Sequence, residues 1–297
     1  MLGDQGGLLL ARARRRRFFR SRSVLERVGV SSWSFHNDFS STQESQYRGS
    51  HETIALLDFP EMVADRYKIR QLEFVAPHFG STEPAYLQEL KVRLTRAHSH
   101  LVNIAVDIEE LRTEGGLSDP APAVRERAVQ ASKLWIDIAA RLRARSVRCD
   151  PGRLNPQHLD PTIDSYRELA AYGRPKGVRV IVENHGGVGS EHPGELVKLF
   201  KKVNSPYFGA LPDFGNFPDE QIRERGLALL FPYALSVCHA KGLKFDPQGN
   251  EAEFDFPACV AIAKRAKFRG IYSIEYEGPG DPYEGVQNVV NELLRNL

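Results

Sequence analysis

The sequence predicts a single-domain α/β protein built as a (β/α)8 barrel. Short apolar runs alternate with longer helical patterns from residue 28 to residue 297. The eight units of roughly 34 residues each match the length of such a barrel. A doubly wound open sheet is the alternative, but it would carry a glycine-rich phosphate turn after its first strand. The sequence there is SSWSFH (31–36), which is not such a turn.

The apolar runs predict eight strands. Several are rich in β-branched residues and nearly continuous, as in VRVIV (178–182), which is typical of buried parallel strands. The expected strands span residues 28–34, 69–76, 101–107, 144–149, 178–184, 207–212, 234–240 and 270–276.

The segments between these runs predict helices. In 121–143, Pro122 stands near the start and apolar residues recur at helical spacing as far as Leu142. Asp219 and Glu220 follow Pro218 and give the helix expected at 219–230 an acidic first turn. The expected helices span residues 51–67, 121–143, 160–172, 193–203, 219–230, 255–267 and 282–296.

Charge is distributed unevenly along the chain. Residues 1–27 hold eight arginines against Asp4 and Glu26, so this segment has a net charge of +6. The whole chain has a net charge of +2, so residues 28–297 have a net charge of −4 (2 minus 6). We expect a basic, disordered extension at 1–27 and a barrel domain at 28–297 that is slightly acidic. The pI of 8.4 therefore indicates no nucleic-acid surface.

The arginine-rich segment also suggests a twin-arginine export signal, which would need an apolar stretch after the arginines. SRSVLER (21–27) follows instead, so we expect a cytoplasmic protein. Three widely spaced cysteines, Cys149, Cys238 and Cys259, form no CxxC motif and suit a reducing compartment. No apolar run is long enough to predict a membrane-spanning helix.

Four polar residues stand near the ends of the last four expected strands. Glu183, Asp213, His239 and Glu275 are separated by 30, 26 and 36 positions, each about one strand plus one helix. The carboxyl ends of barrel strands meet at one face. Three carboxylates and one imidazole there could hold one divalent ion, with Mn²⁺ expected first and Mg²⁺, Co²⁺ or Zn²⁺ as alternatives. Helix caps or rim salt bridges would explain any one acid, but less well four in consecutive units.

Strand alternation adds candidates for catalysis. His185 shares a strand face with Glu183, and Lys241 shares one with His239, whereas Cys238 is expected to point into the helix layer. His185 could act as a general base and Lys241 could neutralise an enolate oxygen. A hydrogen-bonded rim histidine and a solvated lysine are the alternatives.

Other side chains are candidates for substrate contact. Asn216 follows Asp213 by three positions, and a turn would bring it back over the mouth, the face at which the carboxyl ends of the strands meet. The alternative is that Asn216 serves only to form the turn at Gly215-Asn216. Glu277 is a further candidate at the last strand. Trp33 could stack on a sugar ring or pack internally. His78 ends the second strand, and the earlier strands also offer His36 and Glu73.

The order Glu, Asp-x-x-Asn, His, Glu resembles the xylose isomerase-like TIM-barrel superfamily of sugar isomerases, epimerases, inosose dehydratases and family-2 apurinic endonucleases. The resemblance covers residues 28–297. In its ketose epimerases the matching glutamates both hold metal and move protons. It therefore implies that Glu183 and Glu275 flank the substrate carbon, while Asp213 and His239 complete the metal site. The expected function is a divalent-metal-dependent sugar isomerase or epimerase working through a metal-bound enediolate.

Two departures leave the reaction open. The epimerases and endonucleases generally carry histidine where Asn216 stands, and the Asp-x-His of the endonucleases is missing from KFDPQ (244–248). The pairs His239/Lys241 and Glu183/His185 resemble inosose dehydratases and lyases of 3-keto sugars. The alternative is therefore a metal-dependent lyase on a keto-inositol or a 3-keto glycoside. A non-catalytic sugar-binding barrel and an endonuclease are further alternatives.

The expected partner is a small sugar or polyol ketone, more readily unphosphorylated than phosphorylated, with neither nucleic acid nor membrane. Homo-oligomers are common in the resembled family, and a homo-oligomer is possible for this chain. No sequence pattern indicates an interface.

Overall fold

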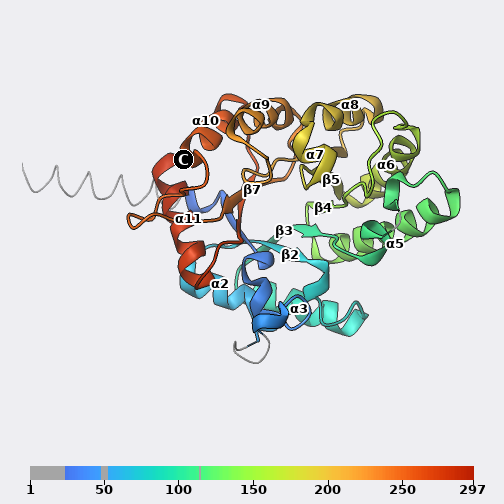
Figure 1. Ribbon diagram of the computed structural model, residues 1–297. Coiled ribbons are helices and arrows are strands. Elements are labelled where there is room, and N and C mark those ends of the chain that lie inside the picture. Colours follow the sequence, from blue (N-terminus) through green and yellow to red (C-terminus); the bar gives the residue numbers. More distant parts are fainter. Residues whose placement is uncertain (1–23, 48–52, 114) are drawn as a thin grey trace, which may run out of the picture.

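The computed structural model describes residues 24–47, 53–113 and 115–297 (Figure 1). The expected disordered extension therefore lies outside the described residues, apart from residues 24–27. Eight parallel strands form one sheet in the order β6-β5-β4-β3-β2-β1-β8-β7. The strands are β1 (Val28–Ser31), β2 (Gln71–Val75), β3 (His100–Ala105), β4 (Ser146–Arg148), β5 (Arg179–Glu183), β6 (Phe208–Leu211), β7 (Val237–Gly242) and β8 (Ile271–Tyr276).

The two outer strands of this order, β6 and β7, close the barrel through isolated contacts. Parallel bridges join Ala210 to Ala234 and Asp213 to His239. The backbone N–H of His239 donates to the carbonyl of Pro212 at 2.9 Å, and the N–H of Phe214 donates to the carbonyl of His239 at 3.2 Å. The expected (β/α)8 barrel of a single domain is confirmed.

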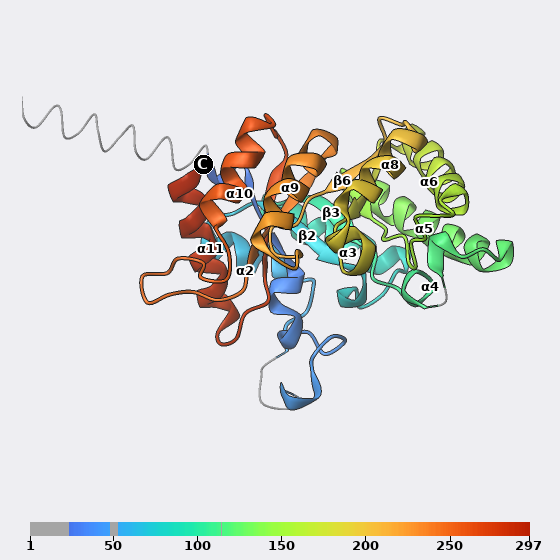
Figure 2. The same ribbon diagram turned by 45° about the horizontal axis from the view of Figure 1, so that its top comes forward.

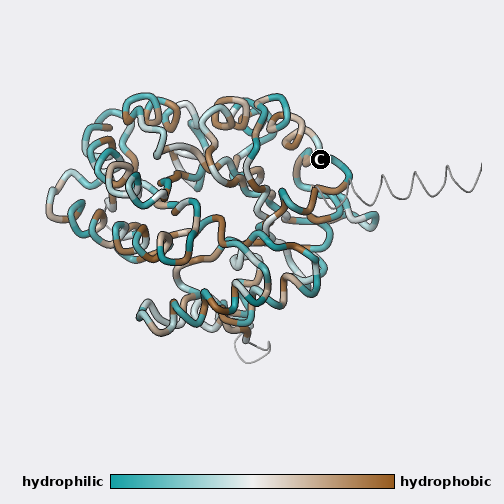
Figure 3. The backbone as a smooth tube through the Cα atoms, turned by 180° about the vertical axis from the view of Figure 1, so that it is seen from behind, coloured by the Kyte–Doolittle hydropathy of each residue, from teal (hydrophilic) through white to brown (hydrophobic). Residues whose placement is uncertain are grey.

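Helices surround the strands (Figures 1 and 2). They are α2 (Phe59–Tyr67), α3 (Pro84–Arg96), α4 (Glu109–Arg112), α5 (Pro122–Leu142), α6 (Asp160–Gly173), α7 (Gly187–Glu191), α8 (Pro193–Val203), α9 (Glu220–Leu230), α10 (Phe256–Arg265) and α11 (Pro282–Asn296). Along them hydrophobic and hydrophilic residues alternate turn by turn, as expected of helices with one face on the sheet (Figure 3). Among the described residues, no helix combines the length and apolar character needed to cross a membrane.

Three of the differences from the expected elements have a clear local cause. Helix α2 begins at Phe59 instead of residue 51, because Pro60 fits only a first helical turn. The expected set lacks α3, whose apolar face is only Leu87, Leu90 and Leu94 among many charged residues. Strand β1 ends at Ser31, where the hydroxyl accepts the N–H of Trp33 and starts a 3₁₀ helix (Ser32–Asp38).

Two separate apolar clusters fill the molecule. The larger one packs the helices onto the outer faces of the strands and includes Cys238, in agreement with the outward direction expected for that thiol. The smaller one lies inside the barrel and consists of Val102, Ile181, Leu211, Val237 and Ile271. Side chains two residues further along a strand point the same way. This inner cluster therefore forms the floor below the layer that contains Glu183, Asp213 and His239.

Candidate metal centre

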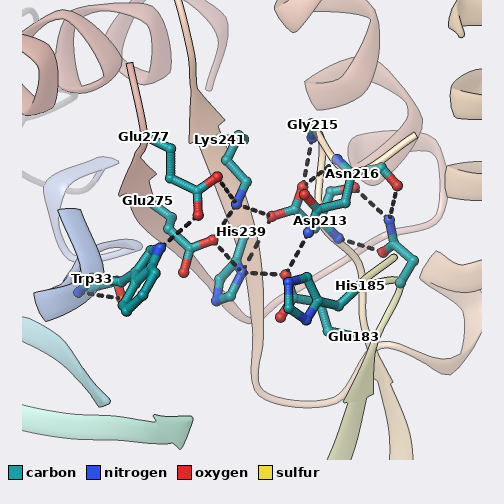
Figure 4. Close-up of polar contacts among 12 residues, drawn as sticks. Trp33, Glu183, His185, Asp213, Gly215, Asn216, His239, Lys241, Glu275 and Glu277 are labelled. Atoms are coloured by element: carbon teal, nitrogen blue, oxygen red, sulfur yellow. Dashed lines mark hydrogen bonds and ion pairs between the residues drawn. The ribbon is translucent and has the colours of Figure 1, made fainter. Parts of the chain in front are cut away.

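Four acidic and imidazole side chains converge at the carboxyl ends of β5 to β8 (Figure 4). Glu183 is the last residue of β5, Asp213 follows β6, His239 lies on β7 and Glu275 on β8. All four are buried, Asp213 and His239 completely. The ring atom Nδ1 of His239 lies 3.0 Å from Glu183 Oε1, 3.2 Å from Glu275 Oε2 and 3.4 Å from Asp213 Oδ2.

The turn after β6 fixes the Asp213 carboxylate. Its Oδ1 accepts the backbone N–H groups of Gly215 at 2.6 Å and Asn216 at 2.8 Å. Its Oδ2 is buried and accepts no hydrogen bond within the described part of the chain. The Asn216 side chain turns back, as expected, and donates to Glu183 Oε1 at 3.0 Å. The nearest charged groups are Lys241 Nζ at 3.1 Å and His239 Nδ1 at 3.4 Å. A buried carboxylate oxygen with ionic neighbours and no hydrogen bond is a suitable ligand for a cation.

The second ring nitrogen of His239 is held from the opposite side of the barrel by Glu73 of β2. Glu73 is fully buried, and its Oε1 lies 3.1 Å from His239 Nε2. Asn103 of β3 donates to the same oxygen at 2.7 Å. Burial opposes protonation of His239, but the carboxylates of Glu275, Glu73 and Glu183 outweigh it and raise the pKa of the ring well above its usual value.

Lys241 lies buried beside the same carboxylates. Its Nζ is 3.1 Å from Asp213 Oδ2, pairs with Glu275 Oε2, and is 3.2 Å from Glu277 Oε2. Burial favours the neutral amine, but Asp213, Glu275 and Glu277 raise the pKa of Lys241 well above its usual value. Glu277 also accepts the indole N–H of Trp33 at 2.6 Å, so the ring of Trp33 is fixed at the mouth (Figure 4).

The two outer glutamates have different electrostatic surroundings. Burial raises the pKa of Glu183, although His239 and Arg148 oppose it. For Glu275 burial acts in the same direction, but His239 and Lys241 outweigh it and hold the pKa well below the usual range. The carboxylate beside Lys241 is therefore the more firmly ionised of the pair.

A charged cluster adjoins the centre on the β4 side. Arg148 pairs with Asp107, Asp150 and Glu183, and His185 Nδ1 lies 3.3 Å from Asp150 Oδ2. The hydrogen bond to Asp150 raises the pKa of His185 to about 9. A cavity of about 430 Å³ opens here, lined by Asp107, Asp150, Glu183 and His185 among others.

This set of donors could bind a divalent cation. One ligand atom from each of Glu183, Asp213, His239 and Glu275 lies within 4.8 Å of the others. Carboxylate oxygens with a single imidazole suit Mn²⁺, Mg²⁺ and related ions, and three carboxylates supply more than enough negative charge for a doubly charged ion. The sequence model of the xylose isomerase-like TIM-barrel family matches residues 64–296.

The chain belongs to the xylose isomerase-like TIM-barrel family. No curated protein matches it in a sequence comparison.

Several solved structures of other proteins share this fold. D-Psicose 3-epimerase from Clostridium cellulolyticum H10 is 15% identical with a TM-score of 0.65, over 91% of this chain and 96% of that one. The probable 3-DHS dehydratase AsbF from Bacillus anthracis is 13% identical with a TM-score of 0.63, over 90% and 98%. A family member from Mycobacterium smegmatis in complex with magnesium is 15% identical with a TM-score of 0.62, over 91% and 97%. At these identities the likeness concerns the fold.

The structure places most of the residues singled out in the sequence at one mouth. The four metal-ligand candidates meet, and Lys241, Asn216, Glu277 and Trp33 contact them or one another. His185 lies beside them, with 56% of its side chain exposed. Their roles stay predictions.

His78 is placed differently from the other candidates for substrate contact. Only 4% of it is exposed, its Nδ1 bonds to Ser32 and its Nε2 to Thr42, and Phe39 stacks on its ring. It could contact a substrate only by giving up one of these partners.

Three residues that contact the centre or its neighbours were not among the site residues expected from sequence: Arg148, Asp150 and Asp107. Glu73 was named as a candidate at the end of an earlier strand, but no role was predicted for it. A signal exists for the β4 pair, because Arg148 and Asp150 are two residues apart at the end of a strand and so share a face.

Proposed function

We propose that this family member is a divalent-metal-dependent sugar isomerase or epimerase. The observation that carries the proposal is the arrangement of Glu183 and Glu275 on either side of His239, in one buried cluster with Asp213 (Figure 4). These four residues would hold the ion, with Mn²⁺ proposed first. When bound, the metal would polarise a ketone and the neighbouring hydroxyl and so acidify the C–H bond between them.

The protein's own side chains would then move the proton. One of the two glutamates removes it from the substrate carbon, and the other returns a proton to the opposite face, which inverts that carbon. Return to the neighbouring carbon interconverts an aldose and a ketose. Lys241, buried between Asp213 and Glu275, supplies a fixed positive charge next to the developing oxyanion.

Residues at the mouth would position the substrate. The hydrogen bond from Trp33 to Glu277 fixes the indole ring, whose flat apolar face suits the C–H face of a sugar ring. The sequence contains no phosphate-binding loop motif, so a free sugar or polyol ketone is the proposed substrate class. We propose no nucleic-acid or membrane partner in addition to this substrate.

Solvent exchange tests this proposal. Mn²⁺-loaded protein is incubated in D₂O with a ketose panel that includes D-fructose, D-tagatose and D-psicose, and deuterium incorporation at each carbon is followed by NMR. We expect exchange at one carbon and its loss in Glu183→Gln and Glu275→Gln. The matched control Glu292→Gln changes a buried glutamate of α11 outside the centre and should leave exchange unchanged. Absence of exchange with every ketose would rule out the isomerase and epimerase.

A second candidate is a lyase on a keto-inositol or a 3-keto glycoside. His185 favours it, because this exposed side chain lies at the cavity beside Glu183 and could serve a leaving group. The candidate also agrees with the dehydratase named among the similar structures. It predicts a product absorbing in the ultraviolet and a large rate loss in His185→Ala, whereas the isomerase predicts neither.

A further inference from the structure

A second group of ligand-type side chains shares Glu183 with the metal centre. Ligand atoms of Asp150, Glu183 and His185 also lie within 4.8 Å of one another. A metal ion in this second group would give a two-metal centre bridged by Glu183, and two-metal centres favour hydrolytic displacement. Whether the chain binds one ion or two therefore bears directly on its chemistry.

Arg148 already holds the oxygen atoms that a second ion would need. Its Nη1 lies 3.2 Å from Glu183 Oε2 and pairs with Asp150 Oδ2. Its Nη2 lies 2.8 Å from Asp107 Oδ2. Only 5% of its side chain is exposed. A guanidinium does not lose its proton in proteins, so this positive charge is permanent.

The two oxygens of Glu183 are thereby divided between two neighbours. Oε1 faces His239 Nδ1 at 3.0 Å and accepts from Asn216 at 3.0 Å, while Oε2 faces Arg148. Only Oε1 is directed at the metal centre. In the same way Asp150 Oδ2 is shared between Arg148 and His185. Asp150 Oδ1 is buried and accepts no hydrogen bond from any described residue, so a second ion could use this oxygen, but it could take Glu183 Oε2 or Asp150 Oδ2 only by displacing the arginine.

We propose that the guanidinium of Arg148 fills the position of a second cation, so that the chain binds a single metal ion and Glu183 contributes one oxygen to it. The inference rests on the metal centre of the proposed function. Removal of the guanidinium would leave Asp107, Asp150 and Glu183 without their shared counter-charge, which is unfavourable for buried carboxylates. A second divalent ion would then restore the balance of charge, with His185 as an additional ligand.

Metal stoichiometry tests the inference without any substrate. The full chain is stripped with chelator, titrated with Mn²⁺ by calorimetry, dialysed and analysed for bound manganese. We expect one ion per chain in the wild type, two in Arg148→Ala, and one in Arg148→Lys, which keeps a cation at the position. The double variant Arg148→Ala with Asp150→Asn should return to one. Electron paramagnetic resonance should show an isolated Mn²⁺ in the wild type and an exchange-coupled pair in Arg148→Ala.

Two results would overturn the inference. The first is a wild type that binds two ions, and the second is a folded Arg148→Ala that still binds one. If the alanine variant does not fold, Arg148→Gln, which retains most of the side-chain length without the charge, takes its place with the same expected second ion. Absence of bound metal from every form would overturn the metal centre itself, and this inference with it, so the two failures are distinguishable.

Discussion

At the scale of single residues, three of the four ligand-type side chains share one design. Asp213, Glu183 and His239 have one polar atom held by a neighbour and another directed at the centre, whereas Glu275 uses Oε2 for both Lys241 and His239. Asp213 uses Oδ1 for backbone N–H groups, Glu183 uses Oε2 for Arg148, and His239 uses Nε2 for Glu73. Such outer partners fix the orientation of ligands and tune their affinity for metal. The residues behind the ligands should therefore matter nearly as much as the ligands.

Glu73→Gln tests this at His239. Glutamine keeps the size of the side chain but offers Nε2 a weaker, uncharged acceptor, so the orientation of the ring is less firmly fixed. We expect Mn²⁺ affinity, measured by calorimetry, to fall about 10-fold to 100-fold. Glu292→Gln, which removes a buried carboxylate in α11, should leave affinity unchanged. Equal affinities in the wild type and Glu73→Gln would refute the positioning role.

His78 predicts a particular response of stability to acid. Burial lowers the pKa of this ring to about 3, against about 6.5 in an unfolded chain. Below pH 6.5 the unfolded chain takes up a proton that the folded protein does not, so the folded state loses stability as the pH falls. Above pH 6.5 the ring is neutral in both states and has no effect. Between pH 7.5 and pH 5 the loss should be about 2 kcal/mol.

Urea unfolding of the wild type and His78→Gln at these two pH values measures this effect. Other groups also titrate, but they contribute to both proteins alike. The wild type should therefore lose about 2 kcal/mol more than the variant on acidification. An equal loss in both would show that His78 takes up a proton in the folded protein.

The ligand candidates could be predicted from sequence because parallel strands bring their carboxyl ends together whatever the intervening helices are. The residues that hold these ligand candidates in place could not be predicted from sequence. Glu73 of β2 and His239 of β7, which contact each other, are 166 residues apart in the chain. The pairing of Arg148 with three carboxylates depends on rotamers that no local pattern specifies. For His78, position at a strand end indicated the mouth, whereas neighbouring hydroxyls bind both its nitrogens.

At the scale of elements, the junction between β6 and β7 holds the centre together. It consists of isolated bridges, one of them between Asp213 and His239 themselves. The apolar runs of the sequence were sufficient to locate all eight strands, each of which is buried over all or nearly all of its length. Periodicity was insufficient for α3, where three leucines stand among charged residues, and for the end of β1, where a serine side chain redirects the backbone.

Gly209 in β6 should be sensitive to any side chain. An added Cβ would lie 2.4 Å from the carbonyl oxygen of Tyr233 and 2.7 Å from Cγ of Leu235, which precede β7. We expect Gly209→Ala to cost about 1–3 kcal/mol of unfolding free energy, as overpacking typically does. Mn²⁺ affinity should fall as well, because the same junction carries Asp213 and His239. Denaturant unfolding and calorimetry measure the two effects.

The matched control is Gly194→Ala in α8, where an added Cβ meets nothing within 4 Å. It should leave stability unchanged or slightly raised, because alanine is the better helix former. Equal stabilities of the two variants would show that the β6–β7 junction adjusts without cost.

At the scale of the whole molecule, the barrel places a charged layer on an apolar floor. Glu183, Asp213 and His239 lie two residues beyond Ile181, Leu211 and Val237 of the inner cluster, and Glu275 of β8 is paired with Lys241 of β7. Buried carboxylates destabilise a fold unless cations balance them. Without metal, His239, Lys241 and Arg148 supply part of that balance, and Asp213 Oδ2 accepts no hydrogen bond from any described residue. Metal binding should therefore stabilise the entire barrel, since this layer joins four of its strands.

Thermal unfolding with and without metal measures this coupling. An ion that binds only the folded chain stabilises it by about 2.7 kcal/mol when its concentration is 100-fold above Kd, which for a chain of this size raises Tm by roughly 4 °C. We expect that rise on adding Mn²⁺ to chelator-treated protein, and its reversal by chelator. Asp213→Asn keeps an acceptor for the turn N–H groups but removes the charge, so its Tm should not respond to Mn²⁺. A wild-type Tm that ignores Mn²⁺, or an equal rise in Asp213→Asn, would mean that the buried carboxylates are balanced without an ion.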